Sequence, residues 1–190
     1  MKKRLFTCVA IATLMLFMVA GPALAEGDNY LSGKVGVGYQ GMIAGDLLNG
    51  ISVRGWATPN FGLEGSFTYG GVGVDVEDYD VADADIMLFE AKAMYAPIVK
   101  ANSRFYLGAK VGYGTIDVEF GGDTILDDDM WELGAFVGAE WSFPTIPEVG
   151  FNFDVGYNYI KYTEDLPYDG PELEIALEGV AATFGIHYYF

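Results

Sequence analysis

The chain has 190 residues, of which 26 are glycine, 13 tyrosine and 13 phenylalanine, and its formal net charge is −17. So acidic a protein repels nucleic acid rather than binding it, and a hydrophobic content of 52% argues against a disordered chain. The length suits a single domain.

The N-terminal segment has the order of a secretory signal peptide. Residues 2–20 pass from a basic triplet to an apolar run, and Ala23 and Ala25 supply small side chains at the −3 and −1 positions of a cleavage site. We therefore expect residues 1–25 to be removed and residues 26–190 to form the mature domain. An uncleaved anchor is disfavoured because the apolar run is short. Cleavage removes Cys8, the single cysteine, and takes the formal charge to −20.

The rest of the sequence alternates apolar and polar residues with the period of two that is typical of β-strands. The eight alternating segments lie, in chain order, at about 31–40, 51–57, 61–69, 87–95, 105–115, 131–143, 151–159 and 180–190. A tilted strand of about ten residues crosses the hydrocarbon layer of a membrane. The pattern predicts an all-β fold, a transmembrane antiparallel up-and-down β-barrel of eight strands.

Aromatic residues gather near the ends of the predicted strands. In the first segment Leu31, Val35, Val37 and Tyr39 share one face, opposite Ser32, Lys34 and Gln40. The aromatic residues near segment ends are Tyr39, Phe61, Tyr69, Tyr95, Phe105, Trp131, Trp141 and Phe190. A soluble β-sandwich would also alternate, but only a barrel in lipid has a use for aromatics at the level of the headgroups.

The predicted connections alternate between short and long. Three are short, at 58–60, 97–104 and 144–149, and four are longer and carry most of the acidic residues, at 41–50, 70–86, 116–130 and 161–178. Short turns on the periplasmic side and long loops outside are typical of outer-membrane barrels. An even number of strands then returns both termini to the periplasm.

Charged residues of both signs fall on the face opposite the apolar one. We expect them to point into the barrel and to form a lumen charge network of Lys34, Arg54, Glu64, Glu90, Lys92, Lys110, Glu132, Glu140, Asp154 and His187. An eight-stranded barrel is only wide enough for side chains, and buried charges are costly unless they pair. The pattern favours a salt-bridged plug, and a narrow gated ion path through the same residues is the alternative.

The last strand carries the most specific motif. Thr183, Gly185, Tyr188 and Phe190 occupy the positions of the C-terminal insertion signal of outer-membrane barrels, a polar residue, a glycine and two aromatics. This ending is similar to that signal without a departure.

Catalytic and metal-binding patterns are weak. His187 is the single histidine, and neither of its same-face neighbours, residues 185 and 189, is a serine that it could activate. We therefore expect no enzyme. The acidic clusters at 78–85 and 123–129 do not have the spacing of a calcium loop, so no metal site and no cofactor is predicted. Weak binding of divalent cations, shared with lipopolysaccharide, is kept as a hypothesis.

On these features the chain resembles the small outer-membrane barrels exemplified by OmpX, the membrane domain of OmpA and the opacity-type proteins. The resemblance implies an integral protein of the Gram-negative outer membrane, inserted by the barrel-assembly machinery and surrounded by lipid and lipopolysaccharide. It also implies a monomer whose acidic loops serve a structural or adhesin-like role toward a surface ligand. A small porin-like channel is the alternative function.

Overall fold

The computed structural model describes residues 29–44, 46–76, 79–120, 123–164 and 173–190. The predicted signal peptide, residues 1–25, lies outside the described residues. Eight strands form one closed barrel: β1 (Val35–Ala44), β2 (Asp46–Trp56), β3 (Phe61–Val76), β4 (Tyr79–Lys100), β5 (Ser103–Phe120), β6 (Asp123–Phe143), β7 (Ile146–Glu164) and β8 (Leu173–Tyr189). The predicted fold class is confirmed. No described helix has the length and apolarity that a membrane span requires.

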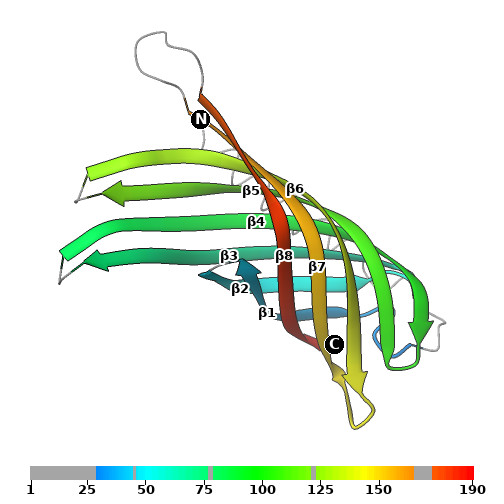
Figure 1. Ribbon diagram of the computed structural model, residues 1–190. Coiled ribbons are helices and arrows are strands. Elements are labelled where there is room, and N and C mark those ends of the chain that lie inside the picture. Colours follow the sequence, from blue (N-terminus) through cyan, green and yellow to red (C-terminus); the bar gives the residue numbers. More distant parts are fainter. Residues whose placement is uncertain (1–28, 45, 77–78, 121–122, 165–172) are drawn as a thin grey trace.

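Every strand pairs antiparallel with its neighbours in sequence, and β1 pairs with β8 to close the barrel (Figure 1). The closing seam runs from Gly36 opposite Tyr189 to Ile43 opposite Ala182. Closure pairs the backbone groups that a sheet edge would leave unpaired, which a lipid environment requires because it offers no water to bond them.

The strands are longer than the alternation predicts. Most of each predicted long connection is strand, so that β4 has 22 residues and β6 has 21, about twice what a membrane crossing needs. The predicted turn at 97–104 is also wrong in its bounds. There β4 continues to Lys100 and β5 begins at Ser103, after a bulge between Tyr95 and Ile98. The alternation does not predict these extensions, because in them the apolar residues face inward and the acidic residues face outward.

The barrel wall is uneven at its outer end. Pairing between β2 and β3 ends at Asn49 opposite Tyr69, and pairing between β6 and β7 ends at Met130 opposite Tyr162. Beyond these points β3 to β6 continue as a four-stranded sheet that runs in one direction, whereas β7 and β8 turn away from it (Figure 1). We call this sheet the outer extension.

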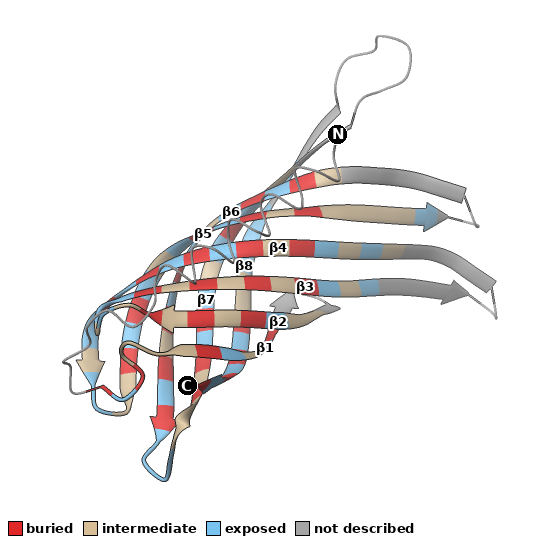
Figure 2. Ribbon diagram, turned by 180° about the vertical axis from the view of Figure 1, so that it is seen from behind, coloured by how far each residue is buried: buried red, intermediate tan, exposed pale blue. Residues whose placement is uncertain are grey.

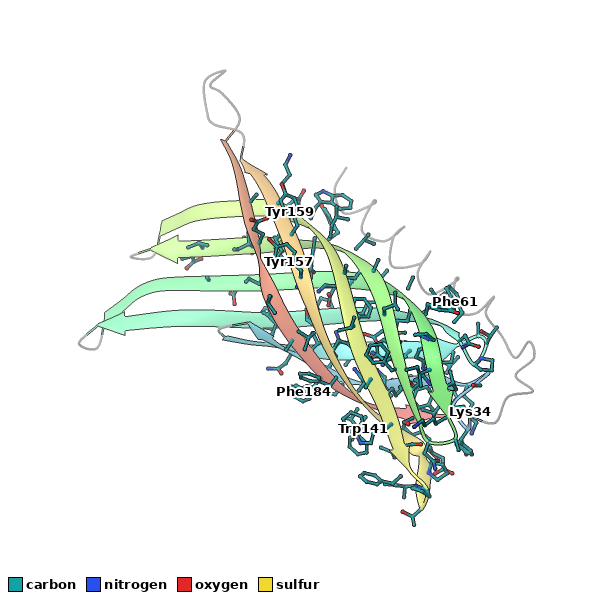
Figure 3. The ribbon with its side chains drawn as sticks, turned by 45° about the vertical axis from the view of Figure 1, so that its right-hand side comes forward. Lys34, Phe61, Trp141, Tyr157, Tyr159 and Phe184 are labelled. Carbon is teal, nitrogen blue, oxygen red and sulfur yellow. The ribbon has the colours of Figure 1, made fainter. Side chains whose placement is uncertain are left out.

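Alternation sets the two faces of the wall (Figure 2). Inward residues are buried, and most outward residues are exposed and apolar, as lipid contact requires. Figure 3 shows the outward side chains of Phe61, Trp141 and Phe184. On β8, Tyr188 and Phe190 of the predicted insertion signal are 59% and 71% exposed, while Thr183 is buried.

Residues 29–33 do not continue β1 but form a turn under the barrel. Gly33 has φ of 78°, a left-handed conformation that favours glycine, and its N–H donates to Trp56 O at 2.7 Å. The turn places Leu31 inside the periplasmic end with 3% of its surface exposed. The sequence had placed Leu31 on the lipid-facing side of a first strand, and this prediction is wrong because the strand begins only at Val35.

The β1–β8 seam depends on close backbone approach at Gly38. A Cβ at Gly38 would lie 2.0 Å from Ile186 O and 2.8 Å from His187 Cα. We expect Gly38→Ala to lower the free energy of unfolding by about 1–3 kcal/mol, because one strand must move. Chemical unfolding in lipid vesicles, followed by tryptophan fluorescence, measures this loss.

Gly179→Ala is the matched control for this substitution. No atom lies within 4 Å of a Cβ at Gly179 on β8, so its effect should stay within about 0.5 kcal/mol. Equal losses in the two variants would contradict the account of the seam.

Candidate functional site

The inward side chains between the two ends of the barrel form a connected charged cluster, here called the interior network. Each predicted lumen residue except Lys34 is buried and faces inward: Arg54, Glu64, Glu90, Lys92, Lys110, Glu132, Glu140, Asp154 and His187. Lys34 precedes β1 and stacks its Nζ 3.4 Å from the centre of the Tyr30 ring. Lys34 therefore lies outside the interior network, because the turn at 29–33 ends the alternation before this residue.

Arg54, on β2, is the most heavily paired cation. Its Nε donates to Glu64 on the neighbouring strand β3, which stands directly opposite it. Its two terminal nitrogens lie 3.7 Å from Glu140 and 3.7 Å from Asp154. Neither Arg54 nor Glu64 is exposed, so each charge depends on the other for its solvation.

Lys92 extends the network across β4. Its Nζ lies 3.1 Å from Glu64 and 3.2 Å from Asp154. Gln40 lies beside this pair, and its amide oxygen accepts from Lys92 Nζ at 3.1 Å when its nitrogen faces Glu64. Asp154 also accepts from Thr183 at 3.2 Å. The central carboxylates are therefore shared between two cations from different strands.

A second, smaller group lies toward the outer end. Lys110 Nζ is 2.6 Å from Glu90 Oε1 and 2.6 Å from Glu132 Oε1. Only the contact with Glu90 has hydrogen-bond geometry, and Ser66 donates to the same carboxylate at 3.2 Å. One lysine thus serves two carboxylates.

Four residues of the interior network were missed by the sequence analysis: Trp56, Arg104, Tyr106 and Tyr189. Three of them surround Glu140, which accepts from Trp56 Nε1 at 2.6 Å and from the Tyr189 hydroxyl at 2.5 Å and lies 3.6 Å from Arg104 Nε. Arg104 was missed because it fell in a predicted turn. The three aromatic residues were missed because only charged side chains were assigned to the predicted network, although alternation with their neighbours places them inside.

Two apolar clusters lie toward the two ends of the barrel, and the first shares Trp56, Tyr106 and Tyr189 with the interior network. The periplasmic layer joins Leu31, Trp56, Met94, Ala96, Tyr106, Phe136 and Tyr189. The outer layer joins Leu88 and Met130, with Leu48, Ile86 and Ile160 packed against them. Between the layers lies a cavity of about 10 Å³ lined by Lys92, Lys110 and Asp154 among others, room for about one water molecule.

His187 has a serine partner that the sequence did not reveal. Ser52 Oγ, on β2, lies 2.7 Å from His187 Nε2, with the residues 135 positions apart. When Asn152 donates to His187 Nδ1 at 3.1 Å, the ring proton is on Nε2 and is given to the serine. A general base must instead accept the serine proton there. Both side chains are also buried, at 2% and 1% exposure.

The acidic outer end holds no metal-binding arrangement within the described residues. Asp85 accepts a hydrogen bond of 2.8 Å from the Tyr69 hydroxyl on the neighbouring strand. The side chains of 78–83 and 123–128 lie outside the described residues. The hypothesis of weak divalent-cation binding there therefore stays a prediction.

Residues 9–190 match the family model described as outer membrane protein beta-barrel domain. The chain belongs to this family. A comparison with curated proteins gave no match. Its membership places the barrel in the outer membrane.

Solved outer-membrane barrels share the fold at low sequence identity. The N-terminal barrel domain of OprF from Pseudomonas aeruginosa is 17% identical, with 84% of this chain and 98% of that chain covered and a TM-score of 0.53. OprG from the same organism is 15% identical, with 86% and 98% covered and a TM-score of 0.54. OprH of P. aeruginosa is 17% identical, with 83% and 99% covered and a TM-score of 0.50. At these identities the likeness concerns the fold alone.

Arg54 holds three carboxylates, so its removal should leave buried negative charge uncompensated. We expect Arg54→Met to destabilise this family member by about 3–5 kcal/mol, the loss typical of breaking a buried ion pair. Unfolding by urea in lipid vesicles, read by tryptophan fluorescence and by gel mobility of unheated samples, measures it.

Lys34→Met is the matched control, since it removes a cation that lies outside the interior network. We expect a loss below about 1 kcal/mol, the value of a partly exposed cation–π contact. A loss as large as that of Arg54→Met would show that Lys34 belongs with the buried pairs.

Proposed function

We propose that this outer-membrane barrel is a non-conducting surface protein, with a lumen plugged by the interior network and an acidic outer extension that contacts an external partner. The observation that carries the plug is the pairing of buried charge across the lumen. Arg54 alone bridges carboxylates from β3, β6 and β7. Ions crossing the barrel would have to separate these pairs, at a cost that such burial makes large.

The outer extension supports the surface role. Among residues 41–50, 70–86, 116–130 and 161–178, Lys161 is the single lysine or arginine, whereas acidic residues occur in every segment. On the backbone, Asp85 stands directly opposite Asp117, and Asp83 opposite Glu119. Like charges opposite one another weaken strand pairing, so the sheet carries them at a cost to its own stability. A positively charged surface ligand is the partner that best complements them.

Several further parts of this proposal come from the sequence. We propose cleavage after Ala25, insertion of residues 26–190 by the barrel-assembly machinery, and a monomer held among lipid and lipopolysaccharide. We propose no catalytic role, because the Ser52–His187 pair is buried and, when Asn152 donates to His187 Nδ1, the ring proton is on the wrong nitrogen for a base.

A small ion channel is the second candidate, favoured by the cavity beside Lys92, Lys110 and Asp154. Planar-bilayer recording separates the two. We expect the purified barrel to show no steady openings. Trp56→Ala combined with Tyr106→Ala should produce them, because these two buried rings lie with their centres 5.7 Å apart inside the lumen.

Trp141→Ala combined with Tyr188→Ala removes two outward rings, exposed by 40% and 59%, and should stay silent. Migration of unheated samples on a gel checks that each variant folds. Large steady openings in the unaltered protein would refute the plug and favour the channel.

The surface role is tested by shortening the outer extension. We expect a variant whose β3–β4 and β5–β6 hairpins close at the pairs Gly71–Asp85 and Thr115–Asp129 to fold, because the closed wall lies below them. Bacteria that display this variant should lose attachment to an immobilised cell layer. Asp85→Asn with Glu119→Gln is the charge control and should weaken attachment partly. Unchanged attachment by the shortened barrel would rule out the extension as the binding surface.

A further inference from the structure

Glu132 is the interior carboxylate with the fewest partners. The other interior carboxylates each have at least two polar partners: Glu64, Glu90, Glu140 and Asp154. Glu132 shares the Nζ of Lys110 with Glu90, and neither of its oxygens makes a hydrogen bond of good geometry with the described residues. Its side chain has no exposed surface. A buried carboxylate in this condition is costly and favours a further cationic partner.

The interior also holds more carboxylates than permanent cations, which favours a further cation. Among the described buried residues, five carboxylates, Glu64, Glu90, Glu132, Glu140 and Asp154, face four permanent cations, Arg54, Lys92, Arg104 and Lys110. His187 does not correct the balance in the neutral form in which Asn152 donates to it. One positive charge near Glu132 would neutralise the interior network.

The surroundings of Glu132 are apolar on its outer side. We call the outer layer of Leu88, Met130, Leu48, Ile86 and Ile160 the collar. A Cβ at Gly112 would lie 3.1 Å from Glu132 Oε2 and 3.1 Å from Leu88 Cδ1, so the carboxylate and the collar both approach this one glycine. An occupant that reaches Glu132 from outside must therefore pass apolar side chains.

We propose that Glu132 and the collar form a binding site for a primary alkylammonium ion that enters from the outer side. The ammonium group would donate to Glu132, and the alkyl chain would lie among the collar side chains. Three features of the site match such an ion: a buried carboxylate whose one cation, Lys110, is shared with Glu90, an excess of formal negative charge in the interior and an aliphatic entrance. The acidic outer segments also raise the local concentration of cations at the mouth. Entry requires the collar to open, and the flexible side chain of Met130 suits that movement.

Calorimetry on the mature barrel in lipid nanodiscs tests the site, with hexylammonium chloride as probe and empty nanodiscs as the blank. We expect saturable binding of one ion per barrel, and none of hexanoate, which has the same chain and the opposite charge. From propyl- to hexylammonium the affinity should rise about fourfold for each methylene that the collar buries. An affinity that does not change with chain length, or equal binding of hexanol, overturns the proposal.

Substitutions then separate the site from general cation attraction. Glu132→Gln keeps the shape and removes the charge, and it should weaken hexylammonium binding about tenfold or more. Glu178→Gln removes an exposed carboxylate at the outer end of β8 and should leave the affinity within about twofold. Equal affinities of Glu132→Gln and the unaltered barrel overturn the proposal. If Glu132→Gln fails the gel test of folding, Glu132→Asp replaces it and should bind more weakly than the parent but still prefer longer chains.

Discussion

A carboxylate inside a lipid-enclosed barrel has no bulk water to solvate it, and the structure depends on how this protein meets that condition. Where the wall contacts hydrocarbon its outward face must be apolar, so alternation sends the charged residues of that part of a strand inward. An interior only wide enough for side chains then has to hold those residues in contact with one another. Arg54 shows the outcome, since it is opposite Glu64 in the β2–β3 register and close to Glu140 and Asp154 from the far wall. The ion pairs are thus a consequence of the barrel and also tie its walls together.

In the plug that we propose, these pairs also act beyond stability. Each central carboxylate is shared between cations from different strands, as Glu64 is between Arg54 and Lys92. Moving one side chain aside therefore leaves two or more charges unsatisfied, which makes concerted opening of the lumen costly. Chemistry inside the lumen meets the same obstacle. The Ser52–His187 pair has a short contact, but both side chains are buried and their hydrogen bond is part of the packing.

The sequence predicted the barrel, the number of strands and nearly all of the charged interior, because period-two alternation encodes those features directly. It failed where alternation stops or where residue type misleads. Leu31 and Lys34 precede β1, and only the turn at Gly33 shows that they leave the strand pattern. Arg104 was missed because it fell in the turn predicted at 97–104. In the structure strand pairing continues past the bulge after Tyr95, and Arg104 lies in β5. Contacts such as Ser52 with His187 depend on which strands face each other across the lumen, which the sequence does not state.

The same alternation also locates the outer boundary of the membrane, which explains why the strands are longer than predicted. Along β6, Leu133 and Trp131 point outward and Glu132 points inward, the arrangement of a wall in lipid. Two residues further out along β6, Met130 is buried inside the barrel. Asp129 lies on the outer face, where it accepts a hydrogen bond from the Tyr113 hydroxyl. On β4 the buried inward residue changes from charged Glu90 to apolar Leu88, and Asp85 lies on the outer face. A wall that is acidic outside and aliphatic inside is stable in water and not in hydrocarbon, so the lipid ends near Trp131. Above that level the strands no longer alternate in the sense that a membrane crossing requires, although their backbone pairing continues. A search for lipid-facing alternation therefore stops at the membrane surface, while the sheet itself continues into the solvent.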